Sequence, residues 1–444
     1  LTDEDGTNLH LFHDDREQGG ETWSQEFNLS GSGERLDWLL GAYYYHDKSN
    51  AELFVTQDAT QPFYEALIGL FGFGAPLPPG SLQALSAGNP LAQTVGPKRR
   101  GMSLATPFLN YTMDQKSTSY AFFGEGKYRI TDDFALTVGA RWTEDKKDVT
   151  RSFGSNYVAL LAPASLCLDK RDKAKWNEAT GNVIAEYNVD KDSMVYGKVS
   201  RGYKAGGFNI GECGAPFDPE TITAYEAGVK TRFFDGQVQA NTAAFYYDYK
   251  DIQILRFLDN SASVENAAAG KIFGIEAEIA IAPRALSGFR LSGNIGYLDT
   301  KYQDASFSDP FAGGAPIDVS GNRMMRAPKW KGSLAAEYGF QTGIGEFRLM
   351  GDANYTSAYF FDVFEASRPN QSEMKQPSYT IVNLRASWTS NDGGLQVTAY
   401  ADNITNKIYA DARLAIPPNG AVYGQFSAPR TYGVRVSAKF GGAR

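Results

Sequence analysis

Few residues of this 444-residue chain have types and spacings that could support catalysis or metal binding. The only histidines are His10, His13 and His46, so a Ser/His hydrolase would have to use one of them. His10 and His13 are three positions apart, which places them on opposite faces of a strand, and we expect them to be solvated or interface residues. The Asp14–Asp15 and Asp132–Asp133 pairs are typical of turns or loops rather than of general acids. The sequence therefore predicts no enzyme activity, no metal site and no cofactor.

The composition narrows the class of protein. A formal net charge of −8 and a pI near 5.2 argue against a nucleic-acid partner. Aromatic residues make up 13% of the chain and glycine occurs 46 times, which suits a β-sheet with aromatic girdles and tight turns. Mean hydropathy is −0.36, and no run of about 18 apolar residues could cross a bilayer as a helix. If the chain spans a membrane, strands must do so.

Apolar and polar residues alternate along many segments, as in strands with one apolar face and one polar face. The clearest segment runs from Thr431 to Phe440. Four more have their apolar faces at Phe134, Leu136, Val138, Ala140 and Trp142; at Phe289, Leu291, Gly293, Ile295 and Tyr297; at Trp330, Gly332, Leu334, Ala336, Tyr338 and Phe340; and at Phe347, Leu349, Gly351, Ala353 and Tyr355. The opposite faces carry residues such as Thr137, Ser292 and Arg348. Aromatic residues at the ends of an apolar face suit the headgroup region of a bilayer.

The connections between these segments fall into two length classes. Short turns lie at 31–34, 131–133, 190–192, 234–236, 284–288, 342–345 and 391–394. Long connections are expected at about 49–115, 151–174, 205–221, 302–323, 358–376 and 404–428. Short periplasmic turns and long outer loops are typical of outer-membrane barrels, whereas the turns of a soluble sandwich or propeller need not sort by length. The predicted fold is all-β: a transmembrane antiparallel up-and-down β-barrel with about sixteen strands and both termini periplasmic.

Several motifs resemble one family when they are taken in order. They are Ser200–Asn209 (SRGYKAGGFN), Asp218–Lys230 (DPETITAYEAGVK), Val264–Ala267 (VENA), Phe273–Glu278 (FGIEAE), Asp402–Tyr409 (DNITNKIY) and Ala428–Gly433 (APRTYG). Their order and spacing resemble the C-terminal barrel of TonB-dependent outer-membrane receptors, in particular those of alphaproteobacteria. The resemblance covers essentially the whole chain.

The resemblance implies a larger protein. The family has a plugged barrel of 22 strands, preceded by a plug and a TonB box. Residues 1–444 are therefore expected to be a C-terminal part of such a barrel, without the plug, the TonB box and the first strands. No export signal is visible at Leu1, so an outer-membrane location requires a mature or truncated chain. Gly441 to Arg444 follow Phe440, whereas the family usually ends on its last aromatic residue.

The resemblance also implies roles for particular residues. Arg201, Tyr203, Tyr359, Phe360 and Phe361 are candidate substrate-binding residues. Other loop aromatics, at Phe63, Tyr64, Phe71, Phe73 and Phe364, could grip a chelate or pack the loops shut. Three further sets have expected roles: Glu226, Lys230 and Arg232 as lumen charges facing the plug; Tyr432, Val434, Val436 and Phe440 as the barrel-assembly signal; and Cys167 with Cys213 as a disulfide between neighbouring external loops.

Two motifs have a structural interpretation besides the functional one. Gly202, Gly206 and Gly207 are expected to let a strand pass into a loop rather than to touch a ligand. Asn403 and Asn406 are expected to satisfy turn backbone where a strand leaves the membrane.

The function that the resemblance implies is active uptake of a scarce, bulky nutrient, a ferric siderophore above all, in the bacterial outer membrane. The expected partners are the TonB–ExbB–ExbD system, outer-membrane lipids and lipopolysaccharide, and the barrel-assembly machinery. A passive porin-like channel remains the alternative, and an adhesin built from the long loops is a third. A porin would not need the ordered motifs.

Overall fold

The computed structural model describes residues 2–3, 12–58, 105–154, 167–210, 213–258, 261–309, 316–365, 374–416 and 421–439. Their strands are β1 (Thr2–Asp3), β2 (Phe12–Ser32), β3 (Leu36–Asp58), β4 (Ala105–Arg129), β5 (Phe134–Gly154), β6 (Cys167–Asn188), β7 (Ser193–Lys204), β8 (Glu220–Phe233), β9 (Val238–Leu258), β10 (Ser261–Ile281), β11 (Phe289–Gln303), β12 (Ser306–Ser308), β13 (Pro316–Asp318), β14 (Trp330–Thr342), β15 (Gly345–Thr356), β16 (Tyr359–Phe360), β17 (Lys375–Gln376), β18 (Tyr379–Thr389), β19 (Leu395–Asp402), β20 (Ala410–Ile416), β21 (Ala421–Phe426) and β22 (Thr431–Ala438). Within these ranges, no helix is both long enough and apolar enough to cross a membrane.

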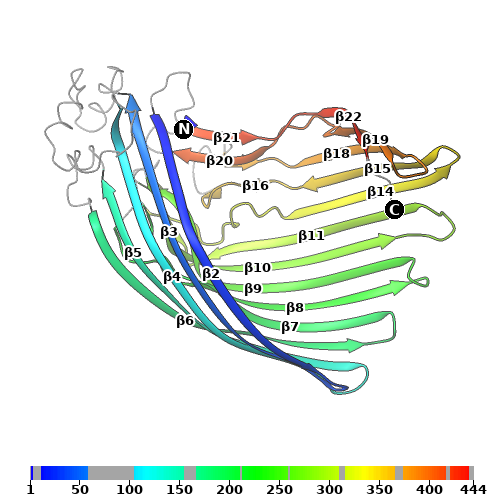
Figure 1. Ribbon diagram of the computed structural model, residues 1–444, viewed down its shortest axis with the longest axis horizontal. Helices are drawn as coiled ribbons and strands as arrows, with labels where there is room; N and C mark the ends of the chain where they lie inside the picture. The colour runs from blue at the N-terminus through cyan, green and yellow to red at the C-terminus, as the bar shows by residue number, and fades with distance from the viewer. Residues whose placement is uncertain are drawn as a thin grey trace.

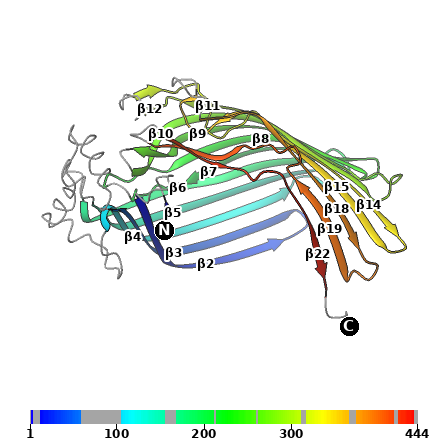
Figure 2. The same cartoon turned by 90° about the horizontal axis from the view of Figure 1, so that it is seen from above.

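Sixteen of the described strands form one antiparallel sheet, as the sequence predicted. Their order is β1-β2-β3-β4-β5-β6-β7-β8-β9-β10-β11-β14-β15-β18-β19-β22, so nearly every strand pairs with its neighbour in the chain. The remaining six strands form three hairpins, β12–β13, β16–β17 and β20–β21. The sheet curls around a hollow (Figures 1 and 2), and the short β1, paired with β2, lies at one end of its strand order and β22 at the other. Among the described residues, β22 pairs only with β19, so the barrel wall is open along that edge.

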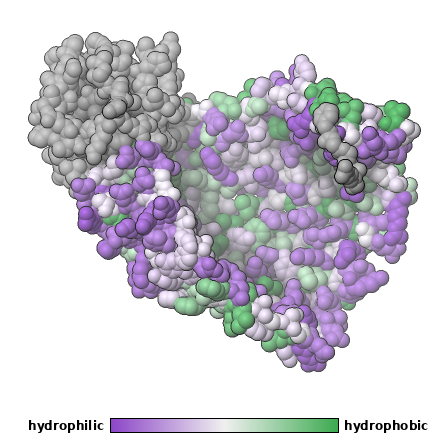
Figure 3. Space-filling view, viewed as in Figure 1, coloured by the Kyte–Doolittle hydropathy of each residue, from purple (hydrophilic) through white to green (hydrophobic). Residues whose placement is uncertain are grey.

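The two faces of the wall match the predicted alternation. Large apolar side chains are exposed on the outer face, including Val138, Leu334 and Val434. Cross-strand register keeps the outward residues of neighbouring strands together, because Val138 lies opposite Val183. The inner face carries polar networks, such as the contact of Asn383 with Asp352. In the space-filling view, hydrophilic residues are frequent along the rim of the hollow (Figure 3).

Aromatic side chains on the outer face lie near both ends of the strands. Towards the long connections, Tyr44 contacts Trp23 and Tyr120, with ring centroids 5.2 and 5.1 Å apart. Towards the short turns, Phe340 stacks on Phe347 at 5.6 Å. Amphipathic rings favour the headgroup region, so the two groups mark the two membrane interfaces.

Several long connections begin later than the sequence suggested. The connection expected at about 49–115 is wrong at both ends, because β3 continues to Asp58 and β4 begins at Ala105. The one expected at 151–174 is shortened in the same way by β5 and β6. A strand needs about 9 to 11 residues to cross a bilayer. The rest of these strands projects beyond it, where charged residues such as Lys173 are compatible with a strand but fell within the loop expected at 151–174.

The short turns rely on left-handed backbone. In the turn between β8 and β9, Phe234, Asp235 and Gly236 have φ values of 53°, 53° and 81°. Gly288, before β11, has φ of 84°, and a Cβ there would lie 1.9 Å from the carbonyl oxygen of Gly339. Only glycine fits this position, because both the φ value and the close approach exclude a side chain.

The alternation of faces can be tested with neighbouring residues of β11. Leu291 lies on the apolar outer face, whereas Ser292 is exposed on the inner face. We expect Leu291→Arg to lower the free energy of unfolding by about 2 to 4 kcal/mol, because a charge near the bilayer midplane is costly, and Ser292→Arg to change it little. Unfolding titrations in lipid vesicles measure both, and equal losses would contradict the assigned faces. Thr137 is a poor inner-face control because it is only 6% exposed.

Candidate functional site

The long-connection end of the barrel wall is closed in part by packed loops. Their apolar core contains Tyr302, Phe307, Val319, Val363 and Phe364, all buried. It joins the loop between β11 and β14 to the loop between β15 and β18, and it also contacts Ile254 on β9. Burial raises the pKa of Tyr302 to about 12, with a smaller contribution from Asp362. This buried loop core holds the loops of the long-connection end in fixed positions.

Polar contacts fix how these two loops lie against each other. The Asn322 side-chain amide donates hydrogen bonds to the carbonyls of Val363 and Phe364, at 3.1 and 3.0 Å. The Arg323 Nε donates to Glu365 Oε1 at 2.7 Å, and its backbone N–H donates to Glu365 Oε2. Both ions are partly buried, which strengthens their attraction. The loop positions are therefore set by directional contacts as well as by apolar packing.

Three cations surround two neighbouring aromatic rings on this surface. Arg323 and Lys375 lie over the ring of Phe360, at 5.2 and 5.8 Å from its centroid, and Arg326 lies over Phe361 at 5.4 Å. Glu365 neutralises Arg323. Arg326 and Lys375 are exposed, and the described residues give neither of them an ion-pair partner. We call Arg323, Arg326, Phe360, Phe361 and Lys375 the cation–aromatic cluster; it can bind an anion and stack a planar group.

Tyrosines flank the cation–aromatic cluster. Tyr359 packs edge-on against Phe361, with ring centroids 5.3 Å apart. Burial, with the neighbouring Tyr379, raises the pKa of Tyr359 to about 12 against the opposing effect of Arg326. Tyr379 stacks on Tyr409 at 4.2 Å. Tyr359 therefore keeps its proton at neutral pH.

The structure separates the predicted substrate-binding residues into two groups. Tyr359 and Phe360 are half-buried, whereas Phe361 and Phe364 are 6% and 5% exposed, so these two pack the loops shut. Arg201 and Tyr203 lie apart on β7, where Arg201 is 3.5 Å from Glu178 and the Tyr203 hydroxyl donates to Asp145. The predicted loop aromatics Phe63, Tyr64, Phe71 and Phe73 lie outside the described residues.

Arg323, Arg326 and Lys375 were missed by the sequence reading. They come from two loops some 50 positions apart, and neither loop contains a recognisable cation motif. The one signal in the first of these loops was the run Arg323-Met-Met-Arg326, in which two arginines flank two methionines. Their meeting depends on the fold.

A buried arginine anchors the loop that contains the first family motif. Arg151 on β5 is fully buried; its guanidinium donates to Asp172 at 2.5 Å and to the carbonyls of Asn209 and Gly214. It also lies 4.9 Å from the ring centre of Phe208. One side chain thus ties the loop after β7 to β5 and β6.

Of the three glycines expected to let a strand pass into a loop, Gly206 and Gly207 lie in the loop after β7 and pack closely, whereas Gly202 lies within β7. A Cβ on Gly206 would lie 2.3 Å from the Phe217 carbonyl oxygen and 2.6 Å from the Trp176 ring. Gly207 forms an isolated bridge with Phe217. Lys147 lies over the Trp176 ring, and burial lowers its pKa. The motif positions backbone rather than a ligand.

Asparagine side chains in the other motifs hold irregular backbone. Asn266 accepts from the Asp218 N–H at 2.6 Å and donates to the carbonyls of Asp218 and Asp251. Asn403, at φ 52°, donates to the carbonyls of Lys407 and Ala428, and Asn406 accepts from the N–H of Arg430. The prediction that Asn403 and Asn406 satisfy turn backbone is confirmed.

The lumen charges lie on the inner face of β8. Glu226 accepts a hydrogen bond from the Tyr196 hydroxyl at 2.6 Å, and Lys230 lies over the Tyr196 ring at 5.5 Å. Arg232 is exposed near the short turns, where its N–H donates to Asp192. These side chains therefore face the hollow that the wall encloses.

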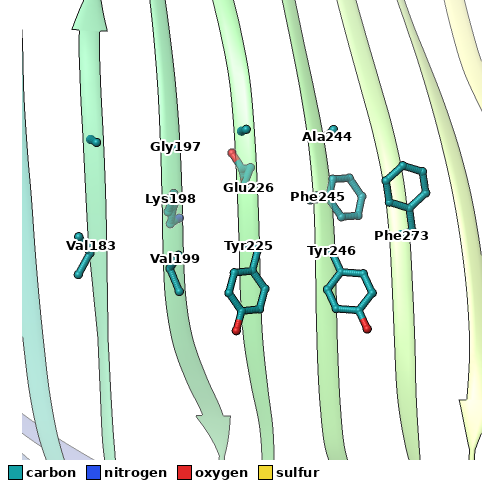
Figure 4. A pocket seen from close by; sticks show the side chains of 12 residues that line it. Val183, Gly197, Lys198, Val199, Tyr225, Glu226, Ala244, Phe245, Tyr246 and Phe273 are labelled. Carbon is teal, nitrogen blue, oxygen red and sulfur yellow. The ribbon is translucent and has the colours of Figure 1, made fainter.

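One depression of the wall lies on the outer face, away from the cation–aromatic cluster. It has a volume of about 530 Å³ and is bounded by Val183, Val199, Tyr225, Tyr246 and Phe273 on five adjacent strands (Figure 4). Gly197 lies at its floor, where an added Cβ would meet nothing within 4 Å. An apolar hollow between outward aromatic rings suits a lipid chain.

The remaining predicted residues lie at the wall or outside the description. Tyr432, Val434 and Val436 are outward and highly exposed on β22, while Phe440 lies outside the described residues. Cys213 lies in the loop between β7 and β8. The Cys167 side chain is not among those described. In the described ranges, no group of three acidic, histidine or cysteine residues could hold a metal ion.

A curled antiparallel sheet with an apolar, aromatic-belted outer face and a loop cap at one end is the wall of a transmembrane β-barrel. Residues 2–404 match the family model described as TonB dependent receptor-like, beta-barrel. The chain belongs to this family, whose members are transport receptors of the bacterial outer membrane. The family expected from the motifs is confirmed.

Similar proteins agree with this assignment. The pesticin receptor of Yersinia pestis is 23% identical over 307 residues, 68% of this chain and 41% of that receptor. The metal-pseudopaline receptor CntO of Pseudomonas aeruginosa is 25% identical over 209 residues, 47% of this chain and 27% of CntO. The crystal structure of the ferric yersiniabactin uptake receptor FyuA from Yersinia pestis superposes with a TM-score of 0.72 at 18% identity, covering 97% of this chain and 56% of FyuA. The chain thus spans about half the length of these relatives, or less.

The role of Arg151 can be tested by removing its charge. Arg151→Met leaves Asp172 without its cation and two loop carbonyls without a donor, so we expect a loss of about 2 kcal/mol of unfolding free energy. We also expect faster proteolysis in the loop after β7. Arg290→Met, on the exposed inner face of β11, is the matched control and should change neither. Unchanged proteolysis of the Arg151 variant would show that the loop is held by other contacts.

The Cys167–Cys213 disulfide stays a prediction, which mass spectrometry can decide. Peptide mapping of the protein without reductant should yield one cross-linked pair of peptides, because an oxidising compartment preserves such a bond. Reduction should release both peptides. Two free thiols in freshly purified protein would refute the pairing.

Proposed function

We propose that the complete protein is a TonB-dependent receptor of the bacterial outer membrane that takes up a metal chelate, a ferric siderophore. The observation that carries this proposal is the family match over residues 2–404. It is supported by the names of the similar receptors, which refer to metal-pseudopaline, to ferric yersiniabactin and to ferric pyoverdine. The chain would cross the membrane many times as the wall of the receptor.

The ligand that best fits the cation–aromatic cluster is an anionic chelate. Arg326 and Lys375 are exposed cations without carboxylate partners among the described residues, and both lie against aromatic rings. Charge attraction and stacking together suit a ligand that carries acidic groups on a planar framework.

The energy for uptake would come from the TonB–ExbB–ExbD system acting through a plug. We propose that the plug and TonB box belong to the complete protein outside these residues. Glu226, Lys230 and Arg232 would then form ion pairs with the plug from the inner face of the wall. Outward residues Tyr432, Val434, Val436 and Phe440 would present the final strand to the barrel-assembly machinery.

A passive porin is not favoured, because the similar proteins include a ferric yersiniabactin uptake receptor and a ferric citrate transporter. An enzyme is not proposed either, since the family consists of transport receptors.

The proposal is tested by uptake of iron-55 bound to an anionic catecholate siderophore, with a neutral hydroxamate siderophore for comparison. Cells that express the complete protein should accumulate the catecholate chelate in preference to the hydroxamate, and deletion of TonB should abolish accumulation. Arg326→Gln with Lys375→Gln should raise the half-saturating concentration of the catecholate chelate about tenfold, which corresponds to about 1.4 kcal/mol.

The matched control is Arg290→Gln with Arg435→Gln, two inner-face arginines outside the cation–aromatic cluster; uptake should be unchanged at equal expression. A leak of small solutes that persists without TonB would instead support a porin. Loss of uptake in the cluster variant without a change in half-saturation would reject the role of the cluster while leaving the transport function intact.

A further inference from the structure

Three tyrosines from separate segments meet beside the cation–aromatic cluster. Tyr359 lies on β16, Tyr379 is the first residue of β18, and Tyr409 directly precedes β20. The Tyr379 and Tyr409 rings stack with their centroids 4.2 Å apart and their planes 7° from parallel. The hydroxyl of Tyr359 is hydrogen-bonded to that of Tyr379. We call Tyr359, Tyr379 and Tyr409 the phenol cluster; all three are half-buried.

A buried glutamine fixes the backbone around the phenol cluster. Gln376 on β17 is the cross-strand partner of Tyr359 and is only 3% exposed. Its side-chain Oε1 accepts a hydrogen bond from the backbone N–H of Ala410 at 2.9 Å, which fixes the residue directly after Tyr409. Ala410 is itself fully buried in an apolar core with Phe361, and Tyr359 packs against that core. The phenol cluster is therefore held by loop backbone as well as by contacts between its rings.

A carboxylate lies near the phenol hydroxyls. Burial is the main cause that raises the pKa of Tyr359 and of Tyr409, and the negative charge of Asp411 raises both further. Asp411 is exposed on β20. The negative charge that disfavours a phenolate in the free protein equally favours a cation bound at the same place.

The paired hydroxyls of Tyr359 and Tyr379 have the spacing of two ligands on one metal ion. Hydroxyl oxygens that share a hydrogen bond are about 2.7 to 2.8 Å apart. Two oxygens at right angles on an ion with bonds of about 2.0 Å are also about 2.8 Å apart. Tyrosine oxygen binds iron in catalase, and a ligand must lose its proton when the metal binds. A ferric ion would therefore replace the protons of these two hydroxyls.

We propose that Tyr359 and Tyr379 directly coordinate the ferric ion of an anionic chelate that leaves two coordination positions open. Arg326 and Lys375 repel a bare cation, but they attract the acidic groups of such a chelate. The phenol oxygens would then complete the coordination of the metal, with the charge of Asp411 beside them. A chelate that already fills every position gains nothing from the phenols. This inference rests on the proposed function and deepens it, because it names the class of chelate that the receptor takes.

The test uses the visible absorption of iron–phenolate bonds. The complete receptor, purified in mild detergent, is titrated with ferric nitrilotriacetate, which leaves positions on the ion open, and with ferric diethylenetriaminepentaacetate, which fills them. We expect the first chelate to produce a phenolate-to-iron charge-transfer band, with tyrosinate vibrations in the resonance Raman spectrum. The second chelate should produce neither signal.

Substitutions locate the ligands. Tyr359→Phe with Tyr379→Phe keeps both rings, removes both oxygens and should abolish the band. Asp411→Asn, at an exposed position, should weaken binding of ferric nitrilotriacetate and leave the band in place. The matched control is Tyr247→Phe with Tyr249→Phe, two tyrosines that share one face of β9, and it should leave both the band and the binding unchanged. Circular dichroism of each variant should match that of the unaltered receptor, so that a lost band reports lost ligands.

Several results would overturn the site. They are the absence of a band in the unaltered receptor, a band that survives in the variant without the Tyr359 and Tyr379 oxygens, and equal bands with the two chelates. Uptake of iron-55 is measured separately in cells. A receptor that transports iron but shows no band keeps the proposed function and loses this site, whereas a band without TonB-dependent uptake does the reverse.

Discussion

The structure depends on one constraint: inside a bilayer, every backbone N–H and C=O must find a partner within the protein. An antiparallel ladder meets this constraint for sixteen strands at once. The ladder fixes a period of two, so each strand has one face towards lipid and one towards the hollow. The apolar and polar faces, the aromatic residues at the strand ends and the short turns with left-handed backbone all follow from it. Where the ladder stops, at the outer edge of β22, the described wall carries unpaired backbone groups.

Outside the ladder of paired strands, side chains provide the hydrogen-bond partners of backbone groups. Asn209, Asn266 and Asn403 each bond backbone groups of a distant loop, as a neighbouring strand would do within the sheet. Arg151 does the same with a charge, and its burial is tolerable because Asp172 and two carbonyls surround it. The motifs that resemble the family therefore hold the loops in place. The cation–aromatic cluster lies among these loops, so its side chains are placed before any ligand arrives.

The sequence was sufficient to predict the strands and faces of the barrel wall. It was not sufficient to predict how the loops pack at the long-connection end. The faces of β5 and β11 could be read from their alternation, because the period of a strand is local information. The ends of β3 to β6 could not, since charged residues such as Asp172 and Lys173 on β6 belong equally well to a projecting strand and to a loop. Phe360 is half-buried and Phe361 is buried, and this difference in burial depends on neighbours from other loops. Arg323 and Lys375 meet over one ring only because the fold brings their loops together, and no spacing in the chain encodes that.

The length of the projecting strands has a consequence for how such a protein can diverge. β4 has 25 residues, about 80 Å of extended chain, of which a bilayer needs less than half. The remainder projects beyond the bilayer as paired strands. Its geometry is set by ladder hydrogen bonds and not by the identity of the residues at its tip. Loops that connect these projecting strands can be replaced, lengthened or repacked without disturbing the membrane-embedded wall. A lineage can thereby acquire a new cargo through a few substitutions at the tip, while the energetically expensive part of the fold is inherited unchanged.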